Sequence, residues 1–283
     1  MFHYVTKNFD YPHFDSDEFE KVIVKLKQNY QIISLKDFDE IQKNNINNEE
    51  KFLMLTFDDG TIDHYNVVYK ILKKHKCSGV FFLTSSNFCD NVLDIQIIHK
   101  LLSLNNFDEM FNLLLNEINK NNIKLDNFNF DENLDDSKVA IFKQLLQKKL
   151  PTNIRKSILN KLIKKYKIST SYADYYINLE QLQEMKSNNM YFGVHTETHP
   201  DLSLLNYSEQ YKEIYNNCKI LKENNLVEDE LLTLSYPYGK YNCDTLKIAK
   251  KLKFKYGFKC NSTGNKSSLE LDRIDCNELK KIL

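Results

Sequence analysis

The stretch LTFDDG, residues 55–60, ends an apolar run that begins at Phe52. A nearly continuous apolar run is typical of a strand covered on both faces, as in a parallel sheet. Two carboxylates, Asp58 and Asp59, stand where that strand would end. Aspartate is a common N-cap, so the pair could simply begin the next helix. The alternative is a site that binds a metal ion and moves a proton, and the other motifs of the chain bear on that choice.

The composition narrows the class of protein and its compartment. The chain has 283 residues, enough for one large α/β domain or two smaller ones. Lysine plus arginine and aspartate plus glutamate both number 39, and this balance argues against a nucleic-acid-binding protein. Six cysteines without a C-x-x-C spacing indicate reduced thiols. The sequence starts without the apolar region of a signal peptide and has no apolar run of about 18 residues, so we expect a soluble, cytoplasmic protein without a transmembrane segment.

Strand and helix patterns alternate along much of the chain. Apolar strands at 52–57 and 79–84 flank a helical pattern at 63–75. This alternation predicts a parallel sheet or barrel. Further helices are expected at 17–28, 107–120, 138–150, 154–166, 179–187, 207–224 and 243–252, and further strands at 1–5, 31–35, 190–194, 231–234 and 269–275.

The middle of the chain has a different character. Apolar residues there recur at three- and four-residue spacing, which predicts amphipathic helices joined by Asn- and Asp-rich connections. We therefore expect an α/β barrel domain formed by residues 1–85 and 174–283, with a helical insertion at 86–173. The insertion either packs on the barrel or forms a homo-oligomer interface, or it acts as a moving lid.

A second motif supplies candidate metal ligands. The stretch FGVHTETHP, residues 192–200, places His195 at the end of a short strand and His199 four residues later. In a helical turn such a pair lies on one face, so both imidazoles can reach one ion, although a zinc site needs a further ligand. A carboxylate from LTFDDG would complete the set, because the carboxyl ends of barrel strands meet at one face. The alternative is a pair of histidines with satisfied hydrogen bonds at a strand end.

A third motif, TLSYPYGKY at residues 233–241, follows another apolar strand. Pro237 has a fixed φ and no backbone N–H, so it could stiffen a loop that aims the Tyr238 N–H at a substrate. A rigid N–H donor of this kind stabilises a developing oxyanion. An ordinary Tyr/Pro/Gly turn at the end of a strand is the alternative.

The three motifs, in this order, resemble those of the polysaccharide deacetylase family, carbohydrate esterase family 4. The family pattern of T-F-D-D-G, H-[ST]-x-x-H-P and a Pro-Tyr loop is met by TFDDG, HTETHP and YPYG. The opening FHYV, followed by FEKVIVKLKQNYQIISLKDF, resembles one branch of the family. The resemblance covers residues 1–85 and 175–275 and leaves out the helices between them. It implies a distorted (β/α) barrel of about seven parallel strands.

The resemblance also implies roles for the matched residues. Asp58 would be the general base, and Asp59, His195 and His199 would hold a divalent metal, most often zinc. The Tyr238 N–H would then help the metal to stabilise the tetrahedral oxyanion.

The loop that follows the third strand motif would also contact the substrate. Pro237 shapes that loop, and Tyr238 and Tyr241 are candidates for stacking on a sugar ring, because the chain has no tryptophan.

The sequence departs from the family pattern in two places. Ser235 stands where the family often has an arginine, so we expect the usual electrostatic partner of the base to be missing. The family takes its general acid from a late histidine, but no histidine follows His199. His3, at the end of the first strand, is our candidate for that acid. Asp275, Lys259 and a metal-bound water are further candidates.

The expected function is removal of an acetyl group from an N-acetylated or O-acetylated sugar, in the synthesis of a surface polysaccharide. The substrate would be an acetylated sugar, a nucleotide sugar, a lipid-linked sugar or an oligosaccharide. One alternative is hydrolysis of another C–N amide bond on the same fold. The other is a carbohydrate-binding relative that has lost catalysis, which the missing late histidine and Ser235 leave open.

Overall fold

The structure is a computed structural model that describes residues 1–5, 14–44, 51–89, 91–104, 106–124, 138–260, 264, 267–276 and 278. The chain divides into two compact units. Unit 1 holds the described residues of Met1–Lys7, His13–Asp90 and Tyr175–Leu283, and unit 2 holds those of Asn91–Asp174. All three sequence motifs lie in unit 1.

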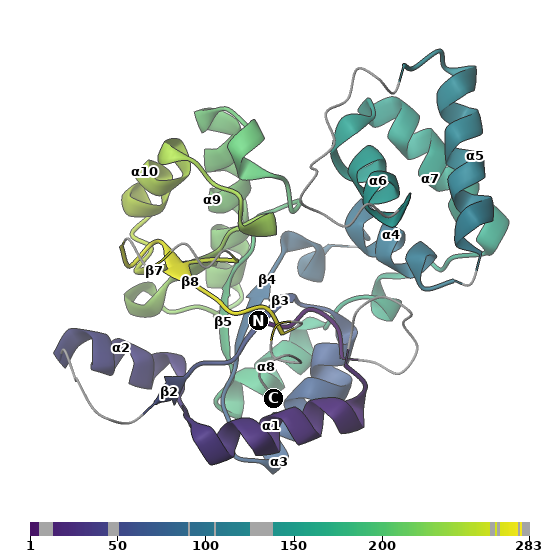
Figure 1. Ribbon diagram of the computed structural model, residues 1–283. Helices are drawn as coiled ribbons and strands as arrows, with labels where there is room; N and C mark the ends of the chain where they lie inside the picture. The colour runs from purple at the N-terminus through teal and green to yellow at the C-terminus, as the bar shows by residue number, and fades with distance from the viewer. Residues whose placement is uncertain are drawn as a thin grey trace. The chain divides into compact units, whose positions relative to one another are not determined.

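A six-stranded parallel sheet forms the centre of unit 1 (Figure 1). Its strands are bonded in the order β3-β4-β5-β6-β7-β8, which is also their order along the chain. Because all neighbours are parallel, the carboxyl ends of the strands lie at one edge, where the sequence motifs follow. The strands are β3 Thr56–Asp59, β4 Val80–Leu83, β5 Tyr191–Val194, β6 Thr233–Ser235, β7 Tyr256–Lys259 and β8 Leu271–Asp272.

The N-terminal segment joins the two edges of this sheet. On one side the Phe2 N–H donates to the Thr56 carbonyl of β3 at 2.9 Å. On the other side the Met1 nitrogen donates to the Ile274 carbonyl at 2.8 Å, and the Cys276 N–H donates to the Met1 carbonyl at 3.0 Å, just beyond β8. Figure 1 shows the N-terminus between β3 and the segment that follows β8. The expected α/β barrel of about seven parallel strands is therefore confirmed.

Close packing of aromatic rings fills the barrel wall. Phe57 of β3 stacks on Phe81 of β4 with ring centroids 4.7 Å apart, and Phe81 in turn contacts Phe192 of β5 at 6.1 Å. Gly193 leaves room for the opposite face, because a Cβ there would lie 2.5 Å from atoms of Phe82 and Thr233. The apolar runs that predicted doubly covered strands thus pack on both faces.

Helices and short turns of unit 1 connect the strands. Four of its helices begin with capping boxes, in which an Asp or Asn side chain and the residue three positions later satisfy each other's backbone N–H groups. A separate pair, β1 Gln31–Ile32 and β2 Phe52–Leu53, is also parallel. The helices are α1 Ser16–Asn29, α2 Leu35–Asn44, α3 Lys70–Lys74, α8 Leu179–Ser187, α9 Tyr207–Glu223 and α10 Cys243–Lys251, with the π-helix η1 His64–Tyr69 and the 3-10 turns η2 Ser85–Phe88, η6 Leu202–Leu204, η7 Asp229–Leu231 and η8 Pro237–Gly239.

Unit 2 is helical, with its own buried apolar side chains such as Leu114, Phe142 and Leu162. The helices expected at 107–120 and 154–166 are confirmed, and the one expected at 138–150 continues from an α-helix into a π-helix. In the described part of the chain, no helix is both long and apolar enough to cross a bilayer. The elements are α4 Asp94–Leu102, α5 Phe107–Lys120, α6 Lys138–Gln144, η4 Leu145–Lys149, α7 Thr152–Tyr166 and η5 Tyr172–Asp174.

Candidate active site

The two carboxylates of LTFDDG belong to the end of β3 and do not cap a helix. Asp58 and Asp59 are both buried, with 1% and 2% of their surface exposed. Asp59 and Gly60 adopt left-handed backbone conformations, with φ of 76° and 66°, so the chain turns sharply where the strand ends. Gly60 is required there, because a Cβ would lie 2.7 Å from side-chain atoms of Leu83 and Asn87.

The histidine motif follows β5 and is shaped by its own side chains. His199 lies in a left-handed conformation with φ of 59°, and its N–H donates to Thr196 Oγ1 at 3.1 Å. Thr196 is also left-handed, with φ of 69°, which is unusual for a β-branched residue. Glu213 of α9 fixes the loop by accepting hydrogen bonds from the Thr198 N–H at 2.8 Å and from the Thr198 hydroxyl at 2.7 Å. Local strain is thus held in place by specific contacts.

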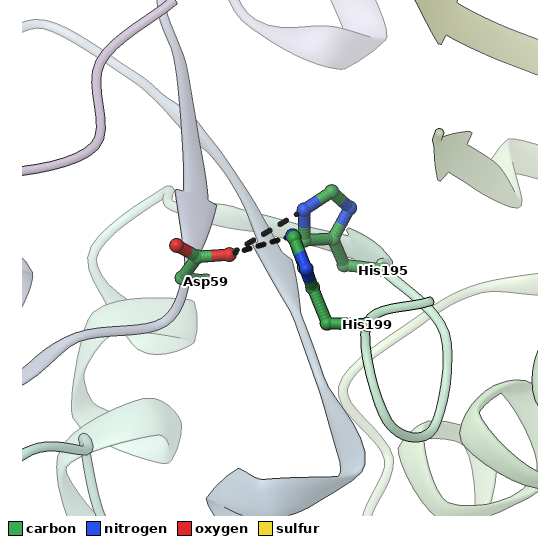
Figure 2. Close-up of side chains that lie close together, drawn as sticks. All are labelled: Asp59, His195 and His199. Atoms are coloured by element: carbon green, nitrogen blue, oxygen red, sulfur yellow. Dashed lines mark ion pairs between the residues drawn. The ribbon is translucent and has the colours of Figure 1, made fainter. Parts of the chain in front are cut away.

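Both imidazoles point at one oxygen of Asp59 (Figure 2). His195 Nε2 lies 3.5 Å and His199 Nε2 lies 3.4 Å from Asp59 Oδ1. These distances are long for hydrogen bonds, but they match the spacing of about 3.4 Å between two ligands of a tetrahedral zinc ion. Asp59, His195 and His199 are all buried, and their ligand atoms lie within 4.8 Å of one another.

The hydrogen bonding of the histidines also suits a metal. His195 Nδ1 lies 2.9 Å from the Ser235 carbonyl oxygen, which can only accept, so Nδ1 donates to it and Nε2 is the nitrogen that faces Asp59. Burial lowers the pKa of His195, but the charge of Asp58, followed by the contacts with Asp59, outweighs burial and raises that pKa, so a metal would take the place of a proton on Nε2. Burial lowers the pKa of His199 to about 4, which keeps that imidazole neutral near pH 7. The donor set of two imidazoles and one carboxylate, which the sequence predicted, therefore fits a divalent metal.

The sequence missed the partner of Asp58. Arg273, just after β8, donates from Nη1 to Asp58 Oδ1 and from Nη2 to Asp58 Oδ2, both at 2.7 Å. Arg273 Nη2 also donates to Ser235 Oγ at 2.8 Å, and the guanidinium carbon lies 5.5 Å from the centre of the Phe82 ring. The expectation that the base lacks an electrostatic partner is therefore wrong.

Arg273 changes the chemistry of Asp58. Burial by itself raises the pKa of the Asp58 carboxyl, but the Arg273 charge, followed by that of His195, outweighs burial and brings the pKa below its usual range. The carboxylate stays ionised in a dry site, where it can accept a proton. One signal in the sequence could have pointed to this residue: Arg273 is one of only two arginines in a chain that otherwise uses lysine.

The third motif forms a turn beside the histidines. Tyr238 is left-handed with φ of 57°, and its ring contacts that of His199 edge-on at 4.7 Å between centroids. Pro237 is buried in the same turn. Tyr241 lies in the other direction: its ring stacks on Tyr236 at 4.6 Å, and its hydroxyl donates to Glu270 Oε1 at 3.0 Å. The roles of Pro237, Tyr238 and Tyr241 toward a substrate stay predictions.

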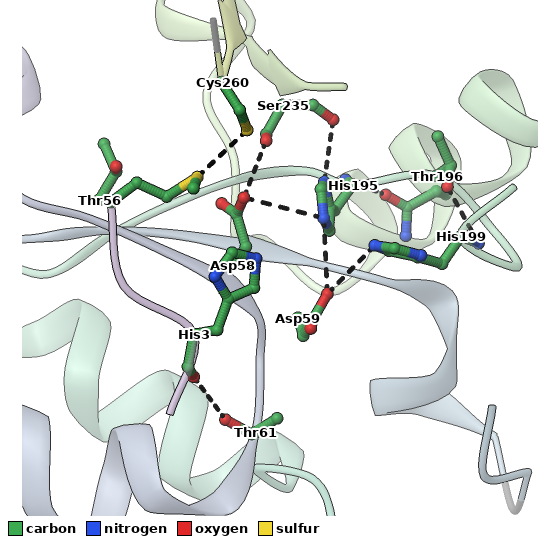
Figure 3. Close-up of polar contacts among 12 residues, drawn as sticks. His3, Thr56, Asp58, Asp59, Thr61, His195, Thr196, His199, Ser235 and Cys260 are labelled. Atoms are coloured by element: carbon green, nitrogen blue, oxygen red, sulfur yellow. Dashed lines mark hydrogen bonds and ion pairs between the residues drawn. The ribbon is translucent and has the colours of Figure 1, made fainter. Parts of the chain in front are cut away.

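Among the candidate acids, His3 lies near the base. Its side chain is half-buried, and it is close enough for its charge to act on the carboxyls of Asp58 and Asp59 (Figure 3). Lys259 is buried and paired with Asp272 at 2.6 Å, and its ammonium also donates to the Gly264 carbonyl. Asp275 is half-buried in the segment that follows Arg273. The barrel edge thus brings His3 together with the carboxylates and histidines of the sequence motifs.

Solved structures share this fold. The chain aligns with the Streptococcus pyogenes deacetylase PplD, solved with acetate, at 21% identity and a TM-score of 0.58, over 96% of this chain and 88% of that one. IcaB from Ammonifex degensii gives 15% identity and a TM-score of 0.60, over 99% and 92% of the two chains. A de-N-acetylase from Aggregatibacter actinomycetemcomitans gives 15% and 0.60, over 100% and 97%.

Comparison of the sequence identifies the family as well as the fold. A Bacillus subtilis protein described as a polysaccharide deacetylase, YxkH, is 30% identical over 83 residues, a match that spans 29% of each chain. The family model for polysaccharide deacetylases matches residues 45–257, which include LTFDDG, both histidines and the Pro-Tyr turn. With the three motifs assembled at one barrel edge and most of the chain matched, this protein belongs to the polysaccharide deacetylase family.

Proposed function

We propose that this protein is a metal-dependent hydrolase that removes the acetyl group from an N-acetylated sugar. The observation that carries the proposal is the pairing of two devices within one buried site. Asp59, His195 and His199 form a cradle that suits zinc, and beside it Arg273 holds Asp58 as an ionised carboxylate. A metal cradle next to a charged base is one arrangement that can hydrolyse an unactivated amide.

Different residues of the chain carry out proton transfer and stabilisation of the oxyanion. A divalent metal, when bound, polarises the acyl oxygen and makes a water more acidic. Asp58 takes a proton from the attacking water as the water oxygen bonds to the acyl carbon, and the Tyr238 N–H donates to the acyl oxygen as that oxygen becomes negative. His3 then gives a proton to the sugar nitrogen as the C–N bond breaks. Water and the N-acetyl sugar are thereby converted into acetate and a free, protonated amino sugar, with the proton count balanced.

The names of related structures support the substrate class. PplD and the Aggregatibacter protein are described as deacetylases, and IcaB has the same fold. We therefore infer a sugar substrate of the kind used in surface polysaccharides, presented as a nucleotide sugar, a lipid-linked sugar or an oligosaccharide. The cytoplasmic location and a homo-oligomer through unit 2 stay predictions, which cell fractionation and light scattering would test.

Acetate release is the decisive measurement. The zinc-loaded protein is assayed across acetylated nucleotide sugars and oligosaccharides, including matched N-acetyl and O-acetyl substrates, and its metal content is measured in parallel. Asp58→Asn should retain zinc but lose at least about 100-fold in kcat, because it removes the proton acceptor. His195→Ala should lose the zinc itself.

Two outcomes would redirect the assignment. Normal turnover by either variant would refute the roles given to Asp58 and His195. Sugar binding without acetate release by the wild-type, zinc-loaded protein would indicate a binding role, and release of ammonia or another amine from a non-sugar amide would indicate the alternative C–N hydrolase.

A further inference from the structure

The N-terminal segment that carries His3 is hydrogen-bonded to the backbone of β3 up to Phe2, and to side chains from His3 onward. Before it, the backbone is bonded to β3, since the Asp58 N–H donates to the Phe2 carbonyl at 3.1 Å. Beyond Asp58 the chain of β3 turns away, because Asp59 and Gly60 are both left-handed. A strand that turns away cannot continue a backbone ladder with its neighbour. The backbone groups that follow Phe2 therefore need other partners.

Side chains from the turn after β3 provide these partners. His64 Nε2 lies 2.7 Å from the His3 carbonyl oxygen, and because a carbonyl only accepts, Nε2 carries the proton and donates. The Val5 N–H donates to Asp63 Oδ2 at 2.6 Å. The adjacent side chains of Asp63 and His64 thus hold the two backbone groups on either side of Tyr4. The Thr61 hydroxyl adds a longer bond of 3.5 Å to the His3 carbonyl (Figure 3).

The identity of His64 is otherwise unexplained. Its side chain has no exposed surface and contacts the rings of Phe57 and Phe81, each with centroids 5.7 Å away. Its Nδ1 has no hydrogen-bond partner among the described residues. A phenylalanine would fill this apolar place without burying an unpaired nitrogen, which costs stability. The bond to the His3 carbonyl is what the histidine contributes.

We propose that His64, together with Asp63, positions His3 for proton donation to the leaving nitrogen. The inference rests on the proposed function, in which His3 is the general acid. One continuous segment, Thr56–His64, then carries the base, a metal ligand and the clamp on the acid. The stretch that carries the proton acceptor therefore also binds the backbone on both sides of Tyr4, next to the proton donor, which helps to set the spacing between acceptor and donor.

The dependence of the rate on the leaving group tests whether His64 positions His3 for proton donation or only stabilises the fold. Hydrolysis of an N-acetyl sugar needs a proton on the departing nitrogen, whereas p-nitrophenolate leaves from p-nitrophenyl acetate without one. His64→Phe should lower kcat on the N-acetyl sugar by about 10- to 100-fold, with KM within about twofold and zinc content unchanged, and should lower p-nitrophenyl acetate hydrolysis by less than about threefold. His64→Gln, whose amide can still donate, should restore most of the lost rate.

Two comparisons complete the test. Tyr69→Phe is the matched control, since it removes a buried hydroxyl of the same helix that bonds Glu184 at 2.9 Å and not the His3 segment. It should leave both reactions unchanged. If His64 acts through His3, the double variant His3→Ala/His64→Phe should be no slower on the N-acetyl sugar than His3→Ala alone. Equal losses on both substrates, or additive losses in the double variant, would overturn the proposal.

A measurement without substrate separates this inference from the proposed function. Exchange of the Val5 amide hydrogen, followed by NMR in the zinc-loaded protein, should accelerate by about tenfold in His64→Phe and in Asp63→Ala, but not in Tyr69→Phe. An unchanged exchange rate of the Val5 amide would refute the clamp, meaning the bonds from His64 and Asp63 to the His3 segment, even if activity fell. A wild-type protein that released no acetate from any sugar would refute the proposed function, and the exchange data would still judge the clamp.

Discussion

At the scale of single residues, the salt bridge between Asp58 and Arg273 governs the site. Both side chains are buried, with 1% and 6% of their surface exposed, and the contact is bidentate. Removing one partner of such a pair leaves an uncompensated charge in a dry environment, which costs about 3–5 kcal/mol. The geometry also fixes the orientation of the carboxylate, since a guanidinium offers two parallel N–H donors.

Substitution of Arg273 should therefore change the pH dependence as well as the rate. Because the guanidinium lowers the pKa of Asp58, its loss raises that pKa, and the base becomes protonated at higher pH. We expect Arg273→Gln to reduce kcat/KM by about 100-fold and to move the acid limb of the pH profile upward, with Arg273→Lys intermediate. Profiles of the zinc-loaded variants from about pH 4 to about pH 9 would show this shift. An acid limb that stays in place would contradict the role.

Sequence reasoning found the local part of the site and missed the distant part. Asp58 and Asp59, like His195 and His199, lie within short motifs whose spacing is visible in the chain. Arg273 reaches Asp58 across 215 residues of sequence, and no local pattern encodes that pairing. Its residue type was the one available signal, because a planar guanidinium suits a bidentate contact that lysine cannot make.

At the scale of elements, α2 is attached to β7 through one acidic side chain. Asp39 of α2 accepts a bond from the Tyr256 hydroxyl at 2.8 Å, pairs with Lys43 at 2.7 Å, and pairs closely with Lys255. Burial raises the pKa of Asp39, but these partners, with Lys255 the strongest, outweigh it and lower the pKa to about 2. A helix outside the sheet is thus tied to a barrel strand by charge.

This network predicts a loss of stability in acid. A carboxyl whose pKa is lower in the folded than in the unfolded state stabilises the fold above about pH 4, and this contribution disappears as the pH falls toward 2. The depression corresponds to about 2 kcal/mol of unfolding free energy. In urea titrations from about pH 5 to pH 2, Asp39→Asn should show a shallower decline than the wild type. Parallel declines would show that Asp39 does not contribute.

Elements were predicted with uneven success for a physical reason. Most strands of the barrel and most of the helices followed from apolar periodicity, but β7, α2 and α4 were not expected. The helix expected at 63–75 instead begins as the π-helix η1. Periodicity over a few turns does not distinguish π-helical from α-helical bonding, because the choice depends on contacts made elsewhere. Here the π-helix includes His64, which contacts the N-terminal segment.

At the scale of the whole molecule, each unit has its own buried core, so we expect two unfolding transitions. Zinc should raise only the transition of unit 1, which contains all three candidate ligands, by about 2.7 kcal/mol at a free concentration 100 times Kd. His195→Ala should abolish this shift. Leu114→Ala, in the core of unit 2, should lower only the other transition, by about 2–5 kcal/mol. Scanning calorimetry would check both effects, and one transition that responds to all these changes would show a single cooperative unit.

The closure of the barrel has a consequence for the order of assembly during synthesis. The ligands of the metal cradle are complete once residue 199 has been made, but Arg273 and the partners of Met1 come from residues 273–276. The bond from Met1 to Ile274 spans 273 residues, and contacts across such separations form late because a long loop must close first. A nascent chain can therefore assemble the candidate metal ligands before Arg273 orients Asp58, and the whole candidate site is complete only after the last strand has left the ribosome.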